Sequence, residues 1–508
     1  MKTLRIILIK PGKYAIDGGV ERFTHGFMPN ASLYHIASLT PAQIGDHRVE
    51  LHRVDEYVWD NLDYLDLLQH QTGTVTLLAL VGVQSHQFHR ALDLAAFARH
   101  RGVEHCAIGG PHPMTCDTTD FHDCGISFAL AEAELIWMTI LEDAIAGQLQ
   151  PLYSDAARWK KQLDETVLQP PLPDELQRYV LPMFGIYPMR GCPYRCNYCS
   201  VVKIAGHQVR GIGIESTMAS LMAAEKAGVR YVAFVSDNFN KYPQVHELLD
   251  AMIDEKLNLR FFCQCDTHIV KQPELFEKLH QANCFEMFVG VESFNRKALK
   301  AAHKFHNFPK RYQLLADQCQ HYGIRAHFSN IMGFPEDTRQ DILYNLECLK
   351  QLNPAVASFY VLTPIPGTEQ YDEFKANELI VETNLDRFDT TCLVWEHPHL
   401  TKTELESLLY ESYVDYYRHL MQQKHRIDEF PEFTIFSRYV ASKGIHPMAG
   451  GTGRIVLDSN RDYLDLRKKT FDIANAPLPE SLGLSAEDDA FNRGKWNAAA
   501  GEKTIQAG

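Results

Sequence analysis

The chain has 508 residues, of which 45% are hydrophobic and 22% are charged, and its formal net charge is −14. This length exceeds what one hydrophobic core normally holds, so we expect two or three domains with the composition of a globular protein. The acidic charge is spread along the chain and argues against a nucleic-acid partner, and the most apolar stretch, residues 75–83, is too short for a transmembrane segment.

Residues 1–150 alternate between strand-like and helix-like segments. Strands are predicted at 4–9, 49–54, 76–83 and 106–108, and an amphipathic helix at 88–98. This order favours an α/β fold, a doubly wound Rossmann-like domain. Ligands of such domains bind at the carboxyl ends of the strands. Those ends carry Gln84 and Ser85, followed later by Gly109, Gly110, Pro111 and His112.

Residues 151–181 are rich in proline and charge and are the predicted linker. A second strand–helix series then occupies residues 182–395. Its predicted strands lie at 184–189, 231–235, 260–263, 287–291, 325–331 and 358–362, which favours a partial (β/α)6 TIM-type barrel. We expect a mainly helical region at 396–474 and a flexible tail at 475–508.

Three cysteines cluster in the loop that follows the first strand of this barrel. Cys192, Cys196 and Cys199 have CxxxCxxC spacing, whereas the other nine cysteines are scattered, as expected for free thiols in a cytoplasmic protein. Thiolates are soft ligands for iron–sulfur clusters and zinc. One loop can hold three corners of a [4Fe–4S] cluster and leave the fourth iron open for S-adenosylmethionine. A zinc site completed by a remote ligand, or three unrelated thiols, are the alternatives.

The cysteine loop, with Tyr198 before its last cysteine, resembles the signature of the radical S-adenosylmethionine (SAM) superfamily. The resemblance continues through residues 236–239, 289–293, 304–307, 331–338 and 363–368, in the order seen in that superfamily. It implies that the cluster cleaves SAM reductively to methionine and a 5′-deoxyadenosyl radical, which abstracts hydrogen from a substrate.

The same resemblance implies which side chains contact SAM. The predicted SAM-binding residues are Tyr198, Ser236, Asp237, Asn238, Glu292, Ser293, Lys304 and Met332. The alternative for Glu292 is a salt-bridged carboxylate of the barrel, and for Asp237 and Asn238 it is a plain Asx turn.

An α/β domain before this barrel resembles the cobalamin-binding subgroup of the superfamily. The residues that carry this are 109–112 and 131–134, although relatives usually have glycine where Ala131 stands. The resemblance implies cobalamin contacts from Gln84, Ser85, Gly109, Gly110, Pro111 and His112; the alternative for the two glycines is a tight strand-to-helix turn.

Residues 120–125 spell DxHxxG, the motif whose histidine binds cobalt in the cobalamin mutases. Here the motif follows the paired glycines instead of the first strand, so we interpret it as coincidence and His122 as a surface histidine. We expect cobalamin to bind without this histidine, and a solvated or core role for His86 and His89.

The commonest reaction in this subgroup is methylation of an unactivated carbon, and the leading hypothesis is a cobalamin-dependent radical SAM C-methyltransferase. Alternatives are a radical SAM cyclase or oxidative rearrangement enzyme, an aminocarboxypropyl transferase, and a non-catalytic cobalamin- or zinc-binding protein. The expected partners are a small-molecule or peptide substrate, enclosed by the barrel mouth and residues 390–439, and an external electron donor such as a flavodoxin or ferredoxin.

Overall fold

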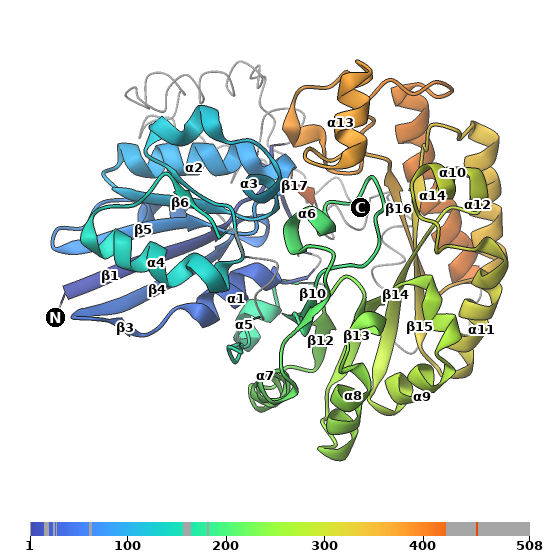
Figure 1. The fold of residues 1–508 in the computed structure, drawn as a ribbon, viewed down its shortest axis with the longest axis horizontal. Helices are drawn as coiled ribbons and strands as arrows, with labels where there is room; N and C mark the ends of the chain where they lie inside the picture. Colours follow the sequence, from blue (N-terminus) through green and yellow to red (C-terminus); the bar gives the residue numbers. More distant parts are fainter. Residues whose placement is uncertain are drawn as a thin grey trace.

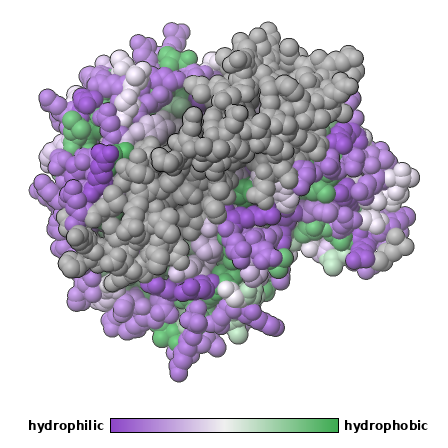
Figure 2. Space-filling view, turned by 180° about the vertical axis from the view of Figure 1, so that it is seen from behind, coloured by the Kyte–Doolittle hydropathy of each residue, from purple (hydrophilic) through white to green (hydrophobic). Residues whose placement is uncertain are grey.

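The computed structural model describes residues 2–14, 20–23, 26, 28–59, 63–155, 163, 165–179, 182–422 and 454–455. Two α/β units lie beside each other (Figure 1). The predicted tail at 475–508 lies outside the described residues, as do parts of the predicted linker and most of 423–474. No helix in the described ranges is long and apolar enough to cross a bilayer, and the face seen in Figure 2 is mostly hydrophilic where it is described.

The N-terminal unit is built on one seven-stranded sheet with the order β3-β4-β1-β5-β6-β7-β8. All of its pairs are parallel except β3–β4. The strands are β1 (Lys2–Lys10), β3 (Gln43–Ile44), β4 (His47–Asp55), β5 (Thr74–Leu80), β6 (His105–Gly109), β7 (Ser127–Ala129) and β8 (Leu152–Tyr153).

Helices cover both faces of this sheet. Because side chains alternate along a strand, Ile6 of β1 packs in the same core as α1 (Ala31–Leu39) and α4 (Ala133–Ala146), while Ile7 packs in the core that contains α2 (Phe88–His100). The short helix α3 (Pro111–Thr115) follows β6. This confirms the predicted doubly wound Rossmann-like fold, whose parallel strands are buried on both faces.

The second unit is a parallel sheet of six strands with the order β16-β15-β14-β13-β12-β9. The strands are β9 (Met183–Ile186), β12 (Tyr231–Phe234), β13 (Arg260–Cys265), β14 (Cys284–Glu292), β15 (Arg325–Met332) and β16 (Val356–Val361). Helices alternate with them: α7 (Ile214–Lys226), α8 (Val245–Asp254), α9 (Pro273–Gln281), α10 (Arg296–Ala301), α11 (Tyr312–His321), α12 (Arg339–Leu352), α13 (Glu369–Ala376) and α14 (Lys402–Gln422). β9 and β16 are the two edges of the sheet, so the predicted partial barrel is confirmed.

One predicted strand, at 184–189, is shorter in the structure. β9 ends at Ile186, and a separate strand β10 (Met189–Arg190) pairs in antiparallel fashion with β11 (Arg210–Gly211). This two-stranded hairpin encloses the cysteine loop and α6 (Val201–Ala205). Other short elements include α5 (Pro173–Leu176) and the paired strands β2 (Arg22–Phe23) and β17 (Arg454–Ile455).

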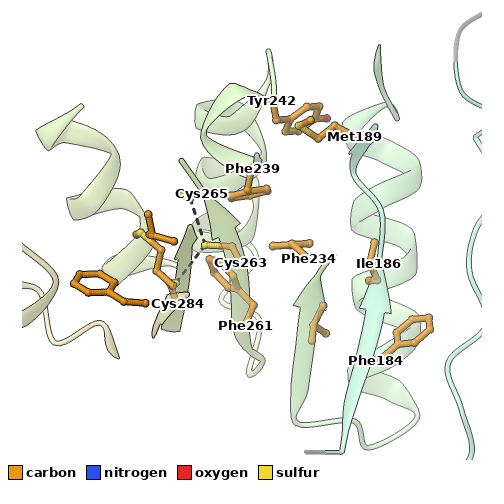
Figure 3. Close-up of a cluster of buried hydrophobic side chains, with 14 of the residues drawn as sticks. Phe184, Ile186, Met189, Phe234, Phe239, Tyr242, Phe261, Cys263, Cys265 and Cys284 are labelled. Atoms are coloured by element: carbon orange, nitrogen blue, oxygen red, sulfur yellow. Dashed lines mark hydrogen bonds between the residues drawn. The ribbon is translucent and has the colours of Figure 1, made fainter. Parts of the chain in front are cut away.

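The outer face of the barrel sheet packs against its helices through large apolar side chains, among them Phe234 and Phe261 (Figure 3). Cys263 lies in this core with its Sγ 3.9 Å from those of Cys265 and Cys284. All twelve cysteines are free thiols. Scattered cysteines such as these three are buried core residues, as the sequence predicts.

The two units are joined by buried ion pairs at the start of α4. Glu132 accepts two hydrogen bonds of 2.7 Å from the guanidinium of Arg210, and Glu134 lies 2.7 Å from Arg190. The Arg210 and Glu132 side chains are each only 5% exposed. Since Arg190 and Arg210 belong to β10 and β11, these pairs fix the hairpin around the cysteine loop against the N-terminal sheet.

We expect Glu132→Ala to lower the free energy of unfolding by about 3–5 kcal/mol, because it leaves the buried Arg210 guanidinium without its carboxylate. Urea denaturation followed by circular dichroism measures this loss. The double variant Glu132→Leu/Arg210→Met removes both charges and should lose much less. Equal losses in the two proteins would contradict a stabilising role of this pair.

Candidate radical SAM site

A crevice runs between the two units and contains two adjoining cavities of about 510 and 400 Å³. Gln84, Pro111 and Ile204 line both of them. The N-terminal unit contributes the carboxyl ends of its strands, as parallel α/β sheets generally do to their ligand sites. The barrel contributes α6, which directly follows the cysteine loop.

The backbone of the cysteine loop depends on Gly191. Its φ is +93°, and a Cβ there would lie 2.2 Å from the carbonyl oxygen of Gln208. Only glycine fits this position without displacing the backbone just before β11. The next residue, Cys192, donates its N–H to the carbonyl of Gly206 at 3.1 Å, which fixes the start of the loop.

The three thiols of the loop lie close enough to influence one another electrostatically. Burial raises the pKa of Cys192 to about 11 and that of Cys199 to about 12, and neighbouring Cys196 adds to both shifts. Such thiols become thiolates only beside strong positive charge, which the irons of a cluster supply. Asn238 donates a hydrogen bond of 2.9 Å to the Cys192 sulfur, a contact that suits a cluster thiolate.

The zinc alternative receives no support from this geometry. A tetrahedral zinc ion holds its thiolates about 2.3 Å away and therefore close together. Within the described ranges, no three or more His, Cys, Asp and Glu side chains converge closely enough to bind one metal ion. Three cysteines on one loop remain the ligand set that the superfamily resemblance implies for a [4Fe–4S] cluster.

A polar group lies next to the loop at the end of β14. Glu292 accepts hydrogen bonds from Lys304 at 2.7 Å and Ser329 at 3.0 Å, and the Tyr198 hydroxyl lies 3.4 Å from the same carboxylate. Burial lowers the pKa of Lys304, but the adjacent Glu292 carboxylate outweighs it, and the net effect is a rise to about 12.

Glu292 is held in an unusual backbone conformation. Its φ is +64°, and the register between β14 and β15 shifts between Gly290 and Glu292. A left-handed conformation of a non-glycine residue costs about 1–3 kcal/mol and persists where surrounding contacts enforce it, often at functional sites. Glu292 is thus a salt-bridged carboxylate, as the alternative interpretation holds, and it also lies beside the cysteine loop.

The other predicted SAM-binding residues divide between two environments. Asp237 lines the smaller cavity, and burial raises its pKa to about 6. Ser236 is saturated by hydrogen bonds with the backbone of Met189, Ser293 bonds to Asn345, and Met332 is packed in the barrel core. Four of the predicted residues therefore lie at the cysteine loop: Tyr198, Asn238, Glu292 and Lys304. The side chains of Ser236, Ser293 and Met332 contact other parts of the protein instead.

The predicted cobalamin-binding residues mostly line the crevice. Ser85 lines the larger cavity, Gly109 and Gly110 the smaller, and Gln84 and Pro111 both. His112 lines neither: its Nδ1 lies 3.0 Å from the Ser85 hydroxyl and its ring packs 4.0 Å from that of Phe88. A Cβ at Gly110 would lie 2.2 Å from the backbone nitrogen of Val83, so this glycine is required by the strand-to-helix turn itself.

Several crevice residues were not predicted from the sequence. Those of the larger cavity include Lys10, Lys13, Tyr57, Tyr360 and Asp389, and those of the smaller include His35, Trp137 and Ile140. They come from segments far apart in the chain and carry no local motif. His35 Nδ1 is buried without a hydrogen-bond partner in the structure, so the smaller cavity offers a polar atom to a ligand.

The three histidines discussed from the sequence take different positions. His86 lines the larger cavity, and burial lowers its pKa to about 3, which keeps it neutral. His89 is buried with its Nδ1 3.2 Å from Asp386. His122 is half-buried beside Thr118 and lines neither cavity. The predicted core role fits His89, while His86 faces the crevice.

Comparison with known proteins places this arrangement in a family. A family model described as "Radical SAM superfamily" matches residues 186–349. The bacteriochlorophyllide d C-12(1)-methyltransferase of Chlorobaculum tepidum is 26% identical over 57% of this chain and 63% of its own length, a little under two thirds. The hopanoid C-2 methylase of Rhodopseudomonas palustris is 24% identical over 75% of this chain and 72% of its own.

Among solved structures, the radical SAM methyltransferase TsrM from Kitasatospora setae, with cobalamin and a [4Fe–4S] cluster bound, shares the fold. Its TM-score is 0.62 at 14% identity, and the match covers the whole of both chains. The partial barrel and its three-cysteine loop define a radical SAM enzyme. Residues 186–349 therefore form a radical SAM domain. Over both units the chain shares the fold of the cobalamin-bound TsrM, which agrees with the predicted fold.

We expect Gly191→Ala to reduce the iron content after reconstitution by more than half, because the added Cβ displaces the loop that carries the cysteines. Iron and sulfide per chain, with the visible absorbance of the cluster, measure this. Gly323→Ala is the matched control, since Gly323 also has a positive φ (+67°) but nothing lies within 4 Å of its Cβ position. Full iron content in Gly191→Ala would contradict the assignment.

Proposed function

We propose that this chain is a cobalamin-dependent radical SAM C-methyltransferase that acts on an unactivated carbon. One observation carries the proposal: the residues that follow the cysteine loop, Ser200 and Ile204, form the wall of cavities whose opposite wall is the carboxyl edge of the Rossmann-like sheet. The end of the cysteine loop and the predicted cobalamin residues therefore border the same space. The relatives named as bacteriochlorophyllide and hopanoid methylases support methyl transfer as the outcome.

When bound, the [4Fe–4S] cluster supplies the electron that cleaves SAM, and cobalamin supplies a transferable methyl group. Cys192, Cys196 and Cys199 hold the cluster in this proposal. Lys304, whose charge is maintained by Glu292, presents a cation beside the cluster loop. A fixed cation and carboxylate at this place suit the carboxylate and amino groups of SAM.

Cobalamin is assigned to the two cavities through Gln84, Ser85, Gly109, Gly110 and Pro111. The residues present fit such a group: the smaller cavity is lined largely by apolar side chains, including Ile136, Trp137 and Ile140. Most bulky organic ligands bind in sites of this kind, mainly apolar with a few polar groups. Of the polar groups here, His35 Nδ1 is unpartnered.

The substrate, a small molecule or a peptide, is proposed to enter the larger cavity, where Tyr360, Thr390 and Thr391 supply barrel-side contacts. The predicted enclosing segment 390–439 is described only as far as 422. Within it, Trp395 and Tyr413 are fully buried and act as packing residues. An external electron donor such as a flavodoxin or ferredoxin is proposed to reduce the cluster, and a cytoplasmic setting suits the free thiols.

Anaerobic reconstitution with iron, sulfide and hydroxocobalamin tests the two-cofactor assignment. We expect about four irons and about one cobalamin per chain after gel filtration. Ala129→Phe should fill part of the smaller cavity and lower the bound cobalamin while leaving the iron unchanged. Met138→Phe, on the exposed side of α4, is the control and should bind both. Four irons without cobalamin would contradict the methyltransferase proposal.

The double variant Glu292→Gln/Lys304→Met should weaken SAM binding by about tenfold or more, since one charge-assisted contact contributes 1.5–3 kcal/mol. Replacing both partners avoids an unpaired buried charge, so the iron content should not change. Equilibrium dialysis of SAM against the reconstituted protein measures the effect. Unchanged affinity would show that this pair only supports the barrel.

A further inference from the structure

The acidic charge of the chain is reversed in one short segment. Residues 295–311 contain six lysines and arginines and no aspartate or glutamate, although the chain as a whole has a net charge of −14. The segment comprises α10 and the turn that leads to α11. Lys304 points inward to Glu292, and Arg296 donates hydrogen bonds to the backbone carbonyls of Asn307 and Phe305. The exposed lysines of the segment are therefore the cations available for a different role.

The outer side of this segment combines exposed cations with exposed aromatic rings. Lys297, Lys300 and Lys310 are exposed, Phe305 is 57% exposed and Phe308 is 38% exposed. Arg296 and Arg311 flank the Phe308 ring, at 4.4 and 4.9 Å from its centre. Among the ion pairs of the described residues, none involves these three lysines. Large exposed aromatic side chains beside cations are typical of protein interfaces.

The same surface is in direct contact with the cysteine loop. Asn197 donates hydrogen bonds from its backbone and side chain to the carbonyls of Ala302 and Ala301, at 3.3 and 3.2 Å. Tyr194, which lies between Cys192 and Cys196, stacks on His306 with ring centres 3.7 Å apart. The exposed Arg195 of the loop adds another cation.

Acidic groups near this surface are few. Glu369 is exposed and lies 3.9 Å from His303. Asp266 is buried beneath the loop and is paired with Lys241 at 3.4 Å. The net charge of this surface is therefore positive. The surface is formed by Arg195, Lys297, Lys300, Phe305, Phe308 and Lys310. We call these six residues the basic aromatic surface.

We propose that the basic aromatic surface docks an acidic protein that delivers single electrons to the cluster. This proposal rests on the proposed function, because it requires a redox-active cluster in the cysteine loop. An exposed positive field steers an acidic partner toward this side of an otherwise acidic protein. The stacked Tyr194 and His306 give close-packed atoms between the surface and the cysteine loop. In each encounter the donor is oxidised by one electron and the cluster is reduced by one, so no further reactant is needed.

The test compares two charge-reversed proteins, both as full chains with a reconstituted cluster. Lys297→Glu/Lys300→Glu changes the basic aromatic surface. The control, Lys226→Glu/Lys256→Glu, changes the net charge by the same amount far from this surface. Its two lysines lie at the ends of α7 and α8, near the amino ends of the barrel strands, at the bottom of Figure 1. Each protein is reduced either by a bacterial flavodoxin hydroquinone or by dithionite, and the bleaching of the cluster absorbance is followed.

We expect flavodoxin to reduce the α10 variant about tenfold or more slowly than wild type at low salt, with a weaker dependence on ionic strength. Dithionite should reduce both variants at the wild-type rate. Titration calorimetry with oxidised flavodoxin should show the same loss of binding without any turnover. Equal flavodoxin rates and affinities for the two variants would overturn the docking proposal. A wild-type cluster that dithionite cannot reduce would instead count against the proposed function.

Discussion

The arrangement of the site depends on four charges that pair where the two units meet, two of them buried. Arg190 and Arg210 stand at the two ends of the hairpin that encloses the cysteine loop, and Glu134 and Glu132 at the start of α4 bind them. Burying so many charges is unfavourable unless each is paired with good geometry. The pairing therefore specifies one position of the cysteine loop against the Rossmann-like sheet, and with it the shape of both cavities.

The fold was predictable from the sequence because its signals are local. The strands are short apolar runs between helical patterns, and a parallel sheet buries such runs on both faces. The three-cysteine loop could be recognised for the same reason, since all three cysteines lie within eight residues after a strand. The hairpin β10–β11 was not predicted, because two strands of two residues leave no periodic pattern.

The details of the site could be predicted less well, and the reasons are geometric. Glu292 has a positive φ, and the strand register shifts beside it, so the direction of the chain changes at this point. As a result, the hydroxyl of the next residue, Ser293, contacts Asn345. His112 was assigned to cobalamin from its place beside the glycines, but the short helix α3 turns its ring against Phe88. Tyr360 and His35 reach the crevice only through the packing of distant segments.

The cysteine loop has two sides with different surroundings. Its first half, through Tyr194 and Asn197, contacts α10 and the turn after it, whereas the residues after Cys199 face the crevice. In the proposed scheme, electron supply and substrate entry therefore follow separate routes to one centre. A donor on the outside and a substrate on the inside would not compete for space, so the proposed scheme leaves the order in which they bind free.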